Sequence, residues 1–132
     1  MSDNTRLYLG SEASDVFAPD NYWQAPLTDK HFSYTVDLSR VGCGCNAAAY
    51  FVNMPGLAST GGDYYCDANY GNNQWCPEYD IMEANKYTMA STIHACDKNP
   101  SDDTWNTCDR AGCQRNAYYV DHNMMCPEER LV

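Results

Sequence analysis

The sequence predicts an all-β sandwich that is stabilised by disulfides. The chain has 132 residues, among them eight Cys, eleven Tyr and eight Gly. Many cysteines combined with turn residues throughout the chain are typical of short strands joined by cross-linked loops. The length predicts one domain over residues 1–132.

Two strands are predicted in the first half of the chain. Residues 31–38 (H-F-S-Y-T-V-D-L) alternate between apolar and polar side chains, which indicates a half-buried strand. Residues 47–54 (A-A-A-Y-F-V-N-M) form a nearly continuous apolar run closed by Pro55-Gly56, which favours a buried strand. Residues 5–10 are a shorter β-prone run, followed by a loop at Pro19-Asp20-Asn21.

Loops dominate the rest of the chain. Residues 59–73 are rich in Gly, Asn, Asp and Tyr, with one fixed point at Cys66, and residues 97–112 are again polar and turn-rich. Residues 118–132 show no clear periodicity. Short strands between long, cross-linked loops favour a sandwich over a helical fold.

Charge and cysteine content narrow the classes of partner. The formal net charge of -10 repels nucleic acid but imposes no penalty on a neutral polysaccharide. No apolar stretch reaches the 18 residues of a membrane span, and residues 1–4 begin no signal peptide. Eight irregularly spaced cysteines favour disulfides and therefore an extracellular, secreted protein. Either the signal peptide was removed, or the sequence is a piece of a longer chain.

Three carboxylates lie within six positions of the segment C-P-E-Y-D-I-M-E-A-N, residues 76–85. If Pro77 opened a helix, Glu78 and Glu83 would lie about 140° apart around its axis and could not share a substrate bond. On a strand, Glu78 and Asp80 face one way, and one β-bulge before Glu83 would bring all three to one face. Retaining glycoside hydrolysis needs two carboxyl groups about 5 to 5.5 Å apart.

The same segment resembles the active-site strand of glycoside hydrolase family 7, the cellobiohydrolases and endoglucanases. Other stretches follow in the family's order: T-R-L-Y-L, F-S-Y-T-V-D-L-S, G-C-G-C-N-A-A-A-Y-F-V-N-M, Y-Y-C-D, I-H-A-C and T-C-D-R-A-G-C-Q-R-N-A-Y-Y. The resemblance covers about residues 5–119 and only the central part of the family's catalytic domain. Residues 120–132 are an unmatched tail.

The resemblance implies a partial concanavalin-like or jelly-roll β-sandwich that cleaves β-1,4-glucan with retention, without a metal or other cofactor. It implies that Glu78 is the nucleophile, Glu83 the general acid and base, and Asp80 the partner that orients Glu78. Five further residues match positions that line the family's cleft: Asn46, Tyr50, Tyr65, Asp67 and His94. Simpler roles stay open, with Tyr50 as a core aromatic, Asn46 as a turn residue and His94 as a loop histidine.

The chain also departs from the family pattern. Met82 stands where the family usually carries Trp, Tyr119 stands where an Arg is expected, and residues 101–108 hold no Arg. The resemblance implies disulfides Cys66–Cys76 and Cys96–Cys108, and leaves Cys43, Cys45, Cys113 and Cys126 unassigned, with Cys126 a potential partner. A zinc site from Cys43-x-Cys45 and His94-x-Cys96 is the alternative, although one-residue gaps suit zinc poorly.

A rival hypothesis belongs to another class of protein. A sandwich that lacks most of the family's strands would leave sheet edges exposed, and such edges pair with other chains. The chain would then be a structural or carbohydrate-binding protein that assembles into an oligomer or fibre, or a fragment without independent function. The intact set Glu78, Asp80 and Glu83 favours the enzyme, and the size of the protein in solution separates the two classes.

Overall fold

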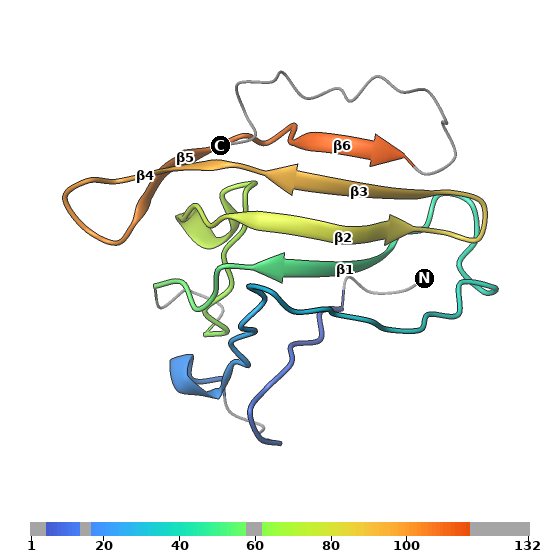
Figure 1. Ribbon diagram of the computed structural model, residues 1–132, viewed down its shortest axis with the longest axis horizontal. Coiled ribbons are helices and arrows are strands. Elements are labelled where there is room, and N and C mark those ends of the chain that lie inside the picture. The colour runs from blue at the N-terminus through green and yellow to red at the C-terminus, as the bar shows by residue number, and fades with distance from the viewer. Residues whose placement is uncertain (1–4, 14–16, 58–61, 117–132) are drawn as a thin grey trace.

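The computed structural model describes residues 5–13, 17–57 and 62–116 (Figure 1). A four-stranded antiparallel sheet has the order β1-β2-β3-β6, and β4 and β5 form a separate two-stranded sheet. The strands are β1 (Ala47–Val52), β2 (Glu78–Ala84), β3 (Met89–His94), β4 (Cys96–Lys98), β5 (Trp105–Cys108) and β6 (Cys113–Asn116). The prediction of an all-β, disulfide-stabilised fold is confirmed.

Helical structure is limited, in the described residues, to two 3-10 turns, η1 (Pro19–Asn21) and η2 (Gly71–Asn73). Neither turn comes near the length or apolar character of a membrane-spanning helix, and no other described residue is helical.

Strand β2 lies in the middle of the larger sheet, between β1 and β3 (Figure 1). A short turn joins β2 to β3, and the Asn85 side-chain oxygen accepts the backbone N–H groups of Tyr87 and Thr88 at 2.9 and 3.2 Å. An Asn side chain that bonds its own backbone in this way stabilises a tight turn. Residues 78–84 are therefore a strand, and the helical alternative for this segment is wrong.

Strands β4 and β5 form a hairpin that leaves the larger sheet after β3 and returns at β6 (Figure 1). Cys96 and Cys108 are paired in register at its base and are joined by a disulfide, as the resemblance implied. Residues 97–112, which the sequence shows to be polar and turn-rich, thus contribute to both strands of this hairpin. Because their composition is polar, hydrophobic periodicity does not reveal the two strands, which the disulfide and β-pairing hold together.

The first half of the chain contains less regular structure than the sequence predicts. Residues 31–38 form no strand, and most of their side chains are exposed, so the prediction of a half-buried strand is wrong. Residues 5–10 make a single bridge, between Gly10 and Tyr22. Alternation specifies a strand only where a partner strand and a buried face are present, and residues 31–38 have no partner strand among the described residues.

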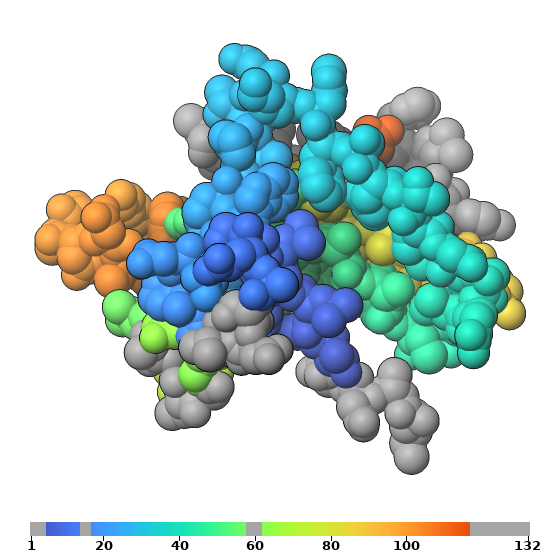
Figure 2. Space-filling view, turned by 90° about the horizontal axis from the view of Figure 1, so that it is seen from below, coloured from blue at the N-terminus to red at the C-terminus, as the bar shows by residue number. Residues whose placement is uncertain are grey.

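These N-terminal segments lie along the outer side of β1 (Figure 1), and in Figure 2 they stand in front of the sheet. The Phe32 ring meets the Phe51 ring of β1 with centroids 5.0 Å apart. The predicted strand over residues 47–54 is confirmed as β1, which ends earlier, at Val52. It is only half-buried, and Tyr50 is 40% exposed.

The loop before β2 is anchored from two sides. The disulfide Cys66–Cys76, which the resemblance also implied, closes this loop, and Cys66 is fully buried. From the other side, the Tyr8 and Tyr22 hydroxyls donate to Asp63, to its carboxylate and its backbone carbonyl respectively. The Tyr8 ring also meets the rings of Phe17, Tyr22 and Tyr65.

The remaining cysteines separate into two groups. Cys43 and Cys45 are free thiols and exposed, whereas Cys113 is disulfide-bonded. Cys126, considered above as a partner, lies outside the described residues. The zinc alternative is wrong, because Cys96 is already used in a disulfide.

Candidate active site

A β-bulge decides which way the three carboxylates point. Against β3, Asp80 pairs with Thr92 and Glu83 pairs with Ala90, so β2 has two residues between these pairs where β3 has one. Paired residues of an antiparallel ladder face the same side, and Thr92 and Ala90 share a face. Glu78, Asp80 and Glu83 therefore lie on one face of the sheet, and the predicted bulge is confirmed.

Glu78 is buried beside a backbone N–H donor. Its Oε2 accepts the backbone N–H of Ala68 at 3.0 Å, and the residue is 7% exposed. Burial raises the pKa of Glu78 to about 7, with the charges of Asp80 and Asp67 acting in the same direction, while the Ala68 bond and His94 oppose the rise. Glu78 thus retains its proton at mildly acidic pH in the absence of a ligand.

Asp80 and His94 share a proton. His94 Nε2 lies 3.0 Å from Asp80 Oδ2, and His94 Nδ1 lies 2.7 Å from the backbone carbonyl oxygen of Asp109. A carbonyl only accepts, so Nδ1 carries a hydrogen, and a further proton must lie between Nε2 and Asp80. The hydrogen bond to Asp80 raises the pKa of His94 to about 9 despite burial, so the His94 ring is an imidazolium at neutral pH.

Glu83 has two potential donors on or before β1. Asn46 Nδ2 donates to Glu83 Oε1 at 3.0 Å, and the Tyr50 hydroxyl lies 3.5 Å from the same oxygen. Burial and the nearby charges of Glu83, Asp80 and Glu78 raise the pKa of Tyr50 to about 12. Tyr50 therefore stays a neutral hydroxyl that senses all three carboxylates.

Asp67 supports the loop that contacts Glu78. The Tyr65 hydroxyl donates to Asp67 Oδ2 at 2.7 Å, and the backbone N–H groups of Asn69 and Gly71 each donate to Oδ1 at 2.8 Å. These bonds shape the turn that directs the Ala68 N–H to Glu78. Of the five residues predicted to line the cleft, Asn46 and Tyr50 contact Glu83 and His94 contacts Asp80, whereas Tyr65 and Asp67 reach Glu78 only through the turn that carries Ala68.

Four contributors to this site were not predicted from the sequence. The N–H of Ala68 and the carbonyl of Asp109 act through backbone atoms, which a residue-type pattern cannot reveal. Thr92 faces Asp80 across the ladder and is 4% exposed, and its hydroxyl has no hydrogen-bond partner among the described residues. Gly112 contributes by having no side chain, and only its place in A-G-C hinted at a turn.

Glu78, Asp80 and His94 lie close enough together to hold a small cation. One ligand atom from each of Glu78, Asp80 and His94 lies within 4.8 Å of the others. However, the Asp80–His94 hydrogen bond already occupies two of these atoms with a shared proton. The arrangement therefore suits a proton held between Asp80 and His94, beside the carboxyl group of Glu78.

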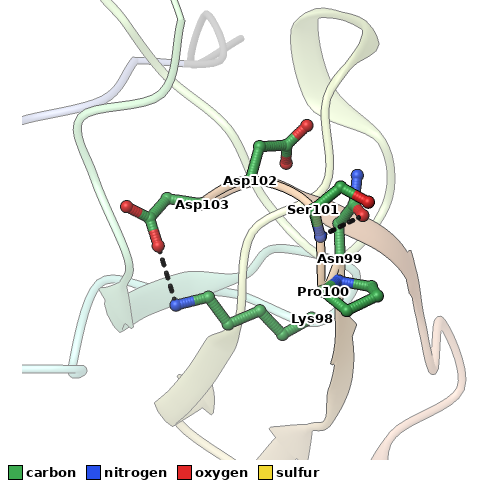
Figure 3. Close-up of a pocket in the computed structure, with 6 residues that line it drawn as sticks. All are labelled: Lys98, Asn99, Pro100, Ser101, Asp102 and Asp103. Carbon is green, nitrogen blue, oxygen red and sulfur yellow. Dashed lines mark hydrogen bonds and ion pairs between the residues drawn. The ribbon is translucent and has the colours of Figure 1, made fainter.

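A separate hollow lies at the tip of the β4–β5 hairpin. Figure 3 shows its lining, in which Lys98 Nζ meets Asp103 Oδ1 at 2.9 Å and the backbone N–H of Ser101 donates to Asn99 at 3.0 Å. Lys98 and Asp103 are both exposed, and exposed ion pairs contribute little to stability. None of the carboxylates of the β2 face lines this hollow, so we do not regard it as the site of chemistry.

Three carboxyl groups on one sheet face, contacted by backbone N–H, hydroxyl, amide and imidazole groups, form the kind of site that glycoside hydrolases use. The sequence profile of Glycosyl hydrolase family 7 matches residues 2–73, a range that ends before β2. The chain belongs to this family.

Curated relatives extend the similarity over most of the chain. The chain is 33% identical to a probable endo-beta-1,4-glucanase celB of Aspergillus clavatus over 86% of this chain and 32% of that relative. It is 29% identical to exoglucanase GH7B of Limnoria quadripunctata over 83% of this chain and 36% of that relative. It is 30% identical to a probable endo-beta-1,4-glucanase celB of Aspergillus terreus over 89% of this chain and 34% of that relative. The chain thus spans about a third of the length of these relatives.

Proposed function

We propose that this protein hydrolyses β-1,4-linked glucan with retention of configuration. The single observation that carries the proposal is the bulge between Asp80 and Glu83, which places Glu78 and Glu83 on one face. Relatives named as an endo-β-1,4-glucanase and an exoglucanase support the choice of substrate class. A neutral glucan also avoids the repulsion that a net charge of -10 would impose on an anionic polymer.

In the first step, Glu78 attacks the anomeric carbon while protonated Glu83 gives its proton to the departing glycosidic oxygen. A covalent glycosyl ester on Glu78 results. In the second step, Glu83 takes a proton from a water molecule, and the resulting hydroxide displaces Glu78 from the sugar. Asn46 and Tyr50, which contact Glu83, are suited to hold its carboxyl group in place through both steps.

The Asp80–His94 pair has an electrostatic role in this scheme. Glu78 must be ionised to attack, and its raised pKa shows that burial opposes ionisation. The imidazolium of His94 offsets the carboxylate of Asp80, so a second uncompensated negative charge does not face Glu78. We assign positioning and charge balance to Asp80 and His94. We assign the binding of sugar hydroxyls to Tyr65 and Asp67, in line with their match to cleft-lining positions of the family.

We also infer an extracellular location. Two disulfides, Cys66–Cys76 and Cys96–Cys108, close loops around the site. Such bonds persist in oxidising compartments, where an insoluble polysaccharide would also be encountered.

The direct test is release of the aryl group from an aryl β-cellobioside, measured from pH 4.5 to pH 8 on purified, oxidised protein of known size. Glu78→Gln should abolish turnover, whereas Glu12→Gln, at an exposed carboxyl outside the site, should not. An unchanged rate in Glu78→Gln, or no turnover by folded wild-type protein, would refute the proposal.

A second candidate function is assembly of this chain with further copies of itself. Three apolar side chains on the sheet face opposite to the carboxylates are strongly exposed: Tyr79 (40%), Met89 (37%) and Ile93 (49%). Sedimentation velocity separates the candidates, because a monomer over a wide concentration range supports the enzyme. Polymers that dissociate when Ile93 is replaced by Lys would support assembly.

A further inference from the structure

The turn between β5 and β6 lies directly against the His94 ring. Its residues 109–112 close the base of the β4–β5 hairpin, next to the disulfide Cys96–Cys108. The backbone N–H of Asp109 donates to the Ala95 carbonyl at 2.8 Å, and the Ala111 N–H donates to the Asp109 side chain at 3.2 Å. These bonds hold the Asp109 carbonyl in a defined place, where it accepts from His94 Nδ1.

Gly112 closes this turn at a position where any side chain would be strained and crowded. Its φ of +66° lies in the left-handed region, which favours glycine. A Cβ built there would lie 2.5 Å from Thr92 Cγ2, 2.7 Å from His94 Cε1 and 2.8 Å from His94 Nδ1. Such distances are far below van der Waals contact, so an added methyl group would have to displace the His94 ring, the Thr92 side chain or the turn itself.

The orientation of the ring matters because both of its nitrogens are engaged. With Nδ1 bonded to Asp109, the opposite nitrogen, Nε2, faces Asp80 at 3.0 Å. Rotation or translation of the ring would break both bonds together. Asp80 would then be left buried, at 5% exposure, and without its partner, and its other oxygen, Oδ1, already lacks a hydrogen-bond partner among the described residues.

We propose that Gly112 and the Asp109 carbonyl form a positioning device that fixes His94 with Nδ1 protonated, so that Nε2 serves Asp80 on the carboxylate face. The charged groups that face the ring are Asp80 and Glu78 from β2, and Asp109 belongs to the turn. The catalytic consequence rests on the function proposed above, whereas the structural assignment of His94 does not.

The test is Gly112→Ala, studied by ¹⁵N NMR of the histidine ring nitrogens and by aryl β-cellobioside turnover. The matched control is Gly44→Ala, because Gly44 has a similar φ of +77° but no atom within 4 Å of a Cβ. Both variants carry backbone strain, and only Gly112→Ala adds the contact with His94. Misplacement on an ångström scale costs about ten- to a hundred-fold in rate, which is the loss expected in kcat/KM for Gly112→Ala.

In the NMR measurement, His94 of the wild type should keep its hydrogen on Nδ1 in the neutral ring and titrate above the ordinary range. In Gly112→Ala this titration should fall to the ordinary range or below it, while Gly44→Ala should match the wild type. A folded Gly112→Ala protein with wild-type His94 titration would overturn the proposal. So would a wild-type ring with its neutral hydrogen on Nε2, a result that does not require the variant to fold.

The two readouts keep the proposals apart. If wild-type protein shows no turnover, the glycosidase proposal fails, and the NMR comparison still decides the role of Gly112. If the wild type is active and His94 is unchanged in Gly112→Ala, only the positioning inference fails.

Discussion

Replacing Glu78 by Gln should remove a large part of the pH dependence of folding stability. In the folded protein the pKa of Glu78 is about 7, above its ordinary value of 4.5, chiefly because burial disfavours the charged carboxylate. The folded state therefore holds this proton more tightly than the unfolded chain does. Its contribution to stability is complete below pH 4.5 and is lost as the pH rises through about 7.

The size of this effect follows from the difference between the two pKa values. At about 1.36 kcal/mol per pKa unit, the free energy of unfolding should fall by about 3 kcal/mol between these limits. The glutamine side chain of the Glu78→Gln variant would not titrate, and its amide oxygen could still accept the Ala68 N–H that Glu78 accepts at 3.0 Å. The variant should therefore show little change over the same pH range.

The assay is urea unfolding, followed by tryptophan fluorescence at pH steps from 4 to 8. Glu12→Gln, at an exposed carboxyl, serves as the matched control and should retain the wild-type curve. If Glu78→Gln loses as much stability as the wild type between pH 4.5 and 7, the attribution to buried Glu78 is refuted. His94→Gln provides a further comparison, because the His94 contribution is present below pH 6.5 and is lost through about pH 9.

Two further predictions concern catalysis. Since the carboxylate of Asp80 raises the pKa of Glu78 and the imidazolium of His94 lowers it, Asp80→Asn should move the acidic limb of the kcat/KM profile to lower pH and His94→Gln should move it to higher pH. Shifts in the same direction for both variants would contradict this electrostatic account. Tyr50→Phe removes the hydroxyl 3.5 Å from Glu83 and should lower kcat by about two- to ten-fold, in line with the loss of one neutral hydrogen bond. An unchanged kcat, measured with the same aryl glycoside, would remove Tyr50 from the positioning of Glu83.

The carboxylate strand could be predicted from the sequence because its chemistry is local. The spacing of Glu78, Asp80 and Glu83 is compatible with a common face only on a strand with a bulge, and the structure has that bulge. The two disulfides followed from the resemblance to the family, because spacing alone leaves 105 pairings of eight cysteines open.

Other features could not be predicted, for reasons that are also physical. The alternation in residues 31–38 indicates a strand, but strand formation needs a partner, and the described residues provide none. The hairpin β4–β5 is polar and short, so hydrophobic periodicity does not detect it. The Ala68 N–H and the Asp109 carbonyl are placed by tertiary structure, since their residue types carry no signal.

The central claim, that Glu78 is the nucleophile of a retaining glycosidase, is tested most directly by trapping the covalent intermediate. Wild-type protein would be incubated with a 2-deoxy-2-fluoro cellobioside carrying a dinitrophenyl leaving group, then digested and examined by mass spectrometry. The account predicts one added fluorocellobiosyl group, on the peptide that contains Glu78, and none in Glu78→Gln. An unmodified wild-type protein, or a label on another residue, would contradict it.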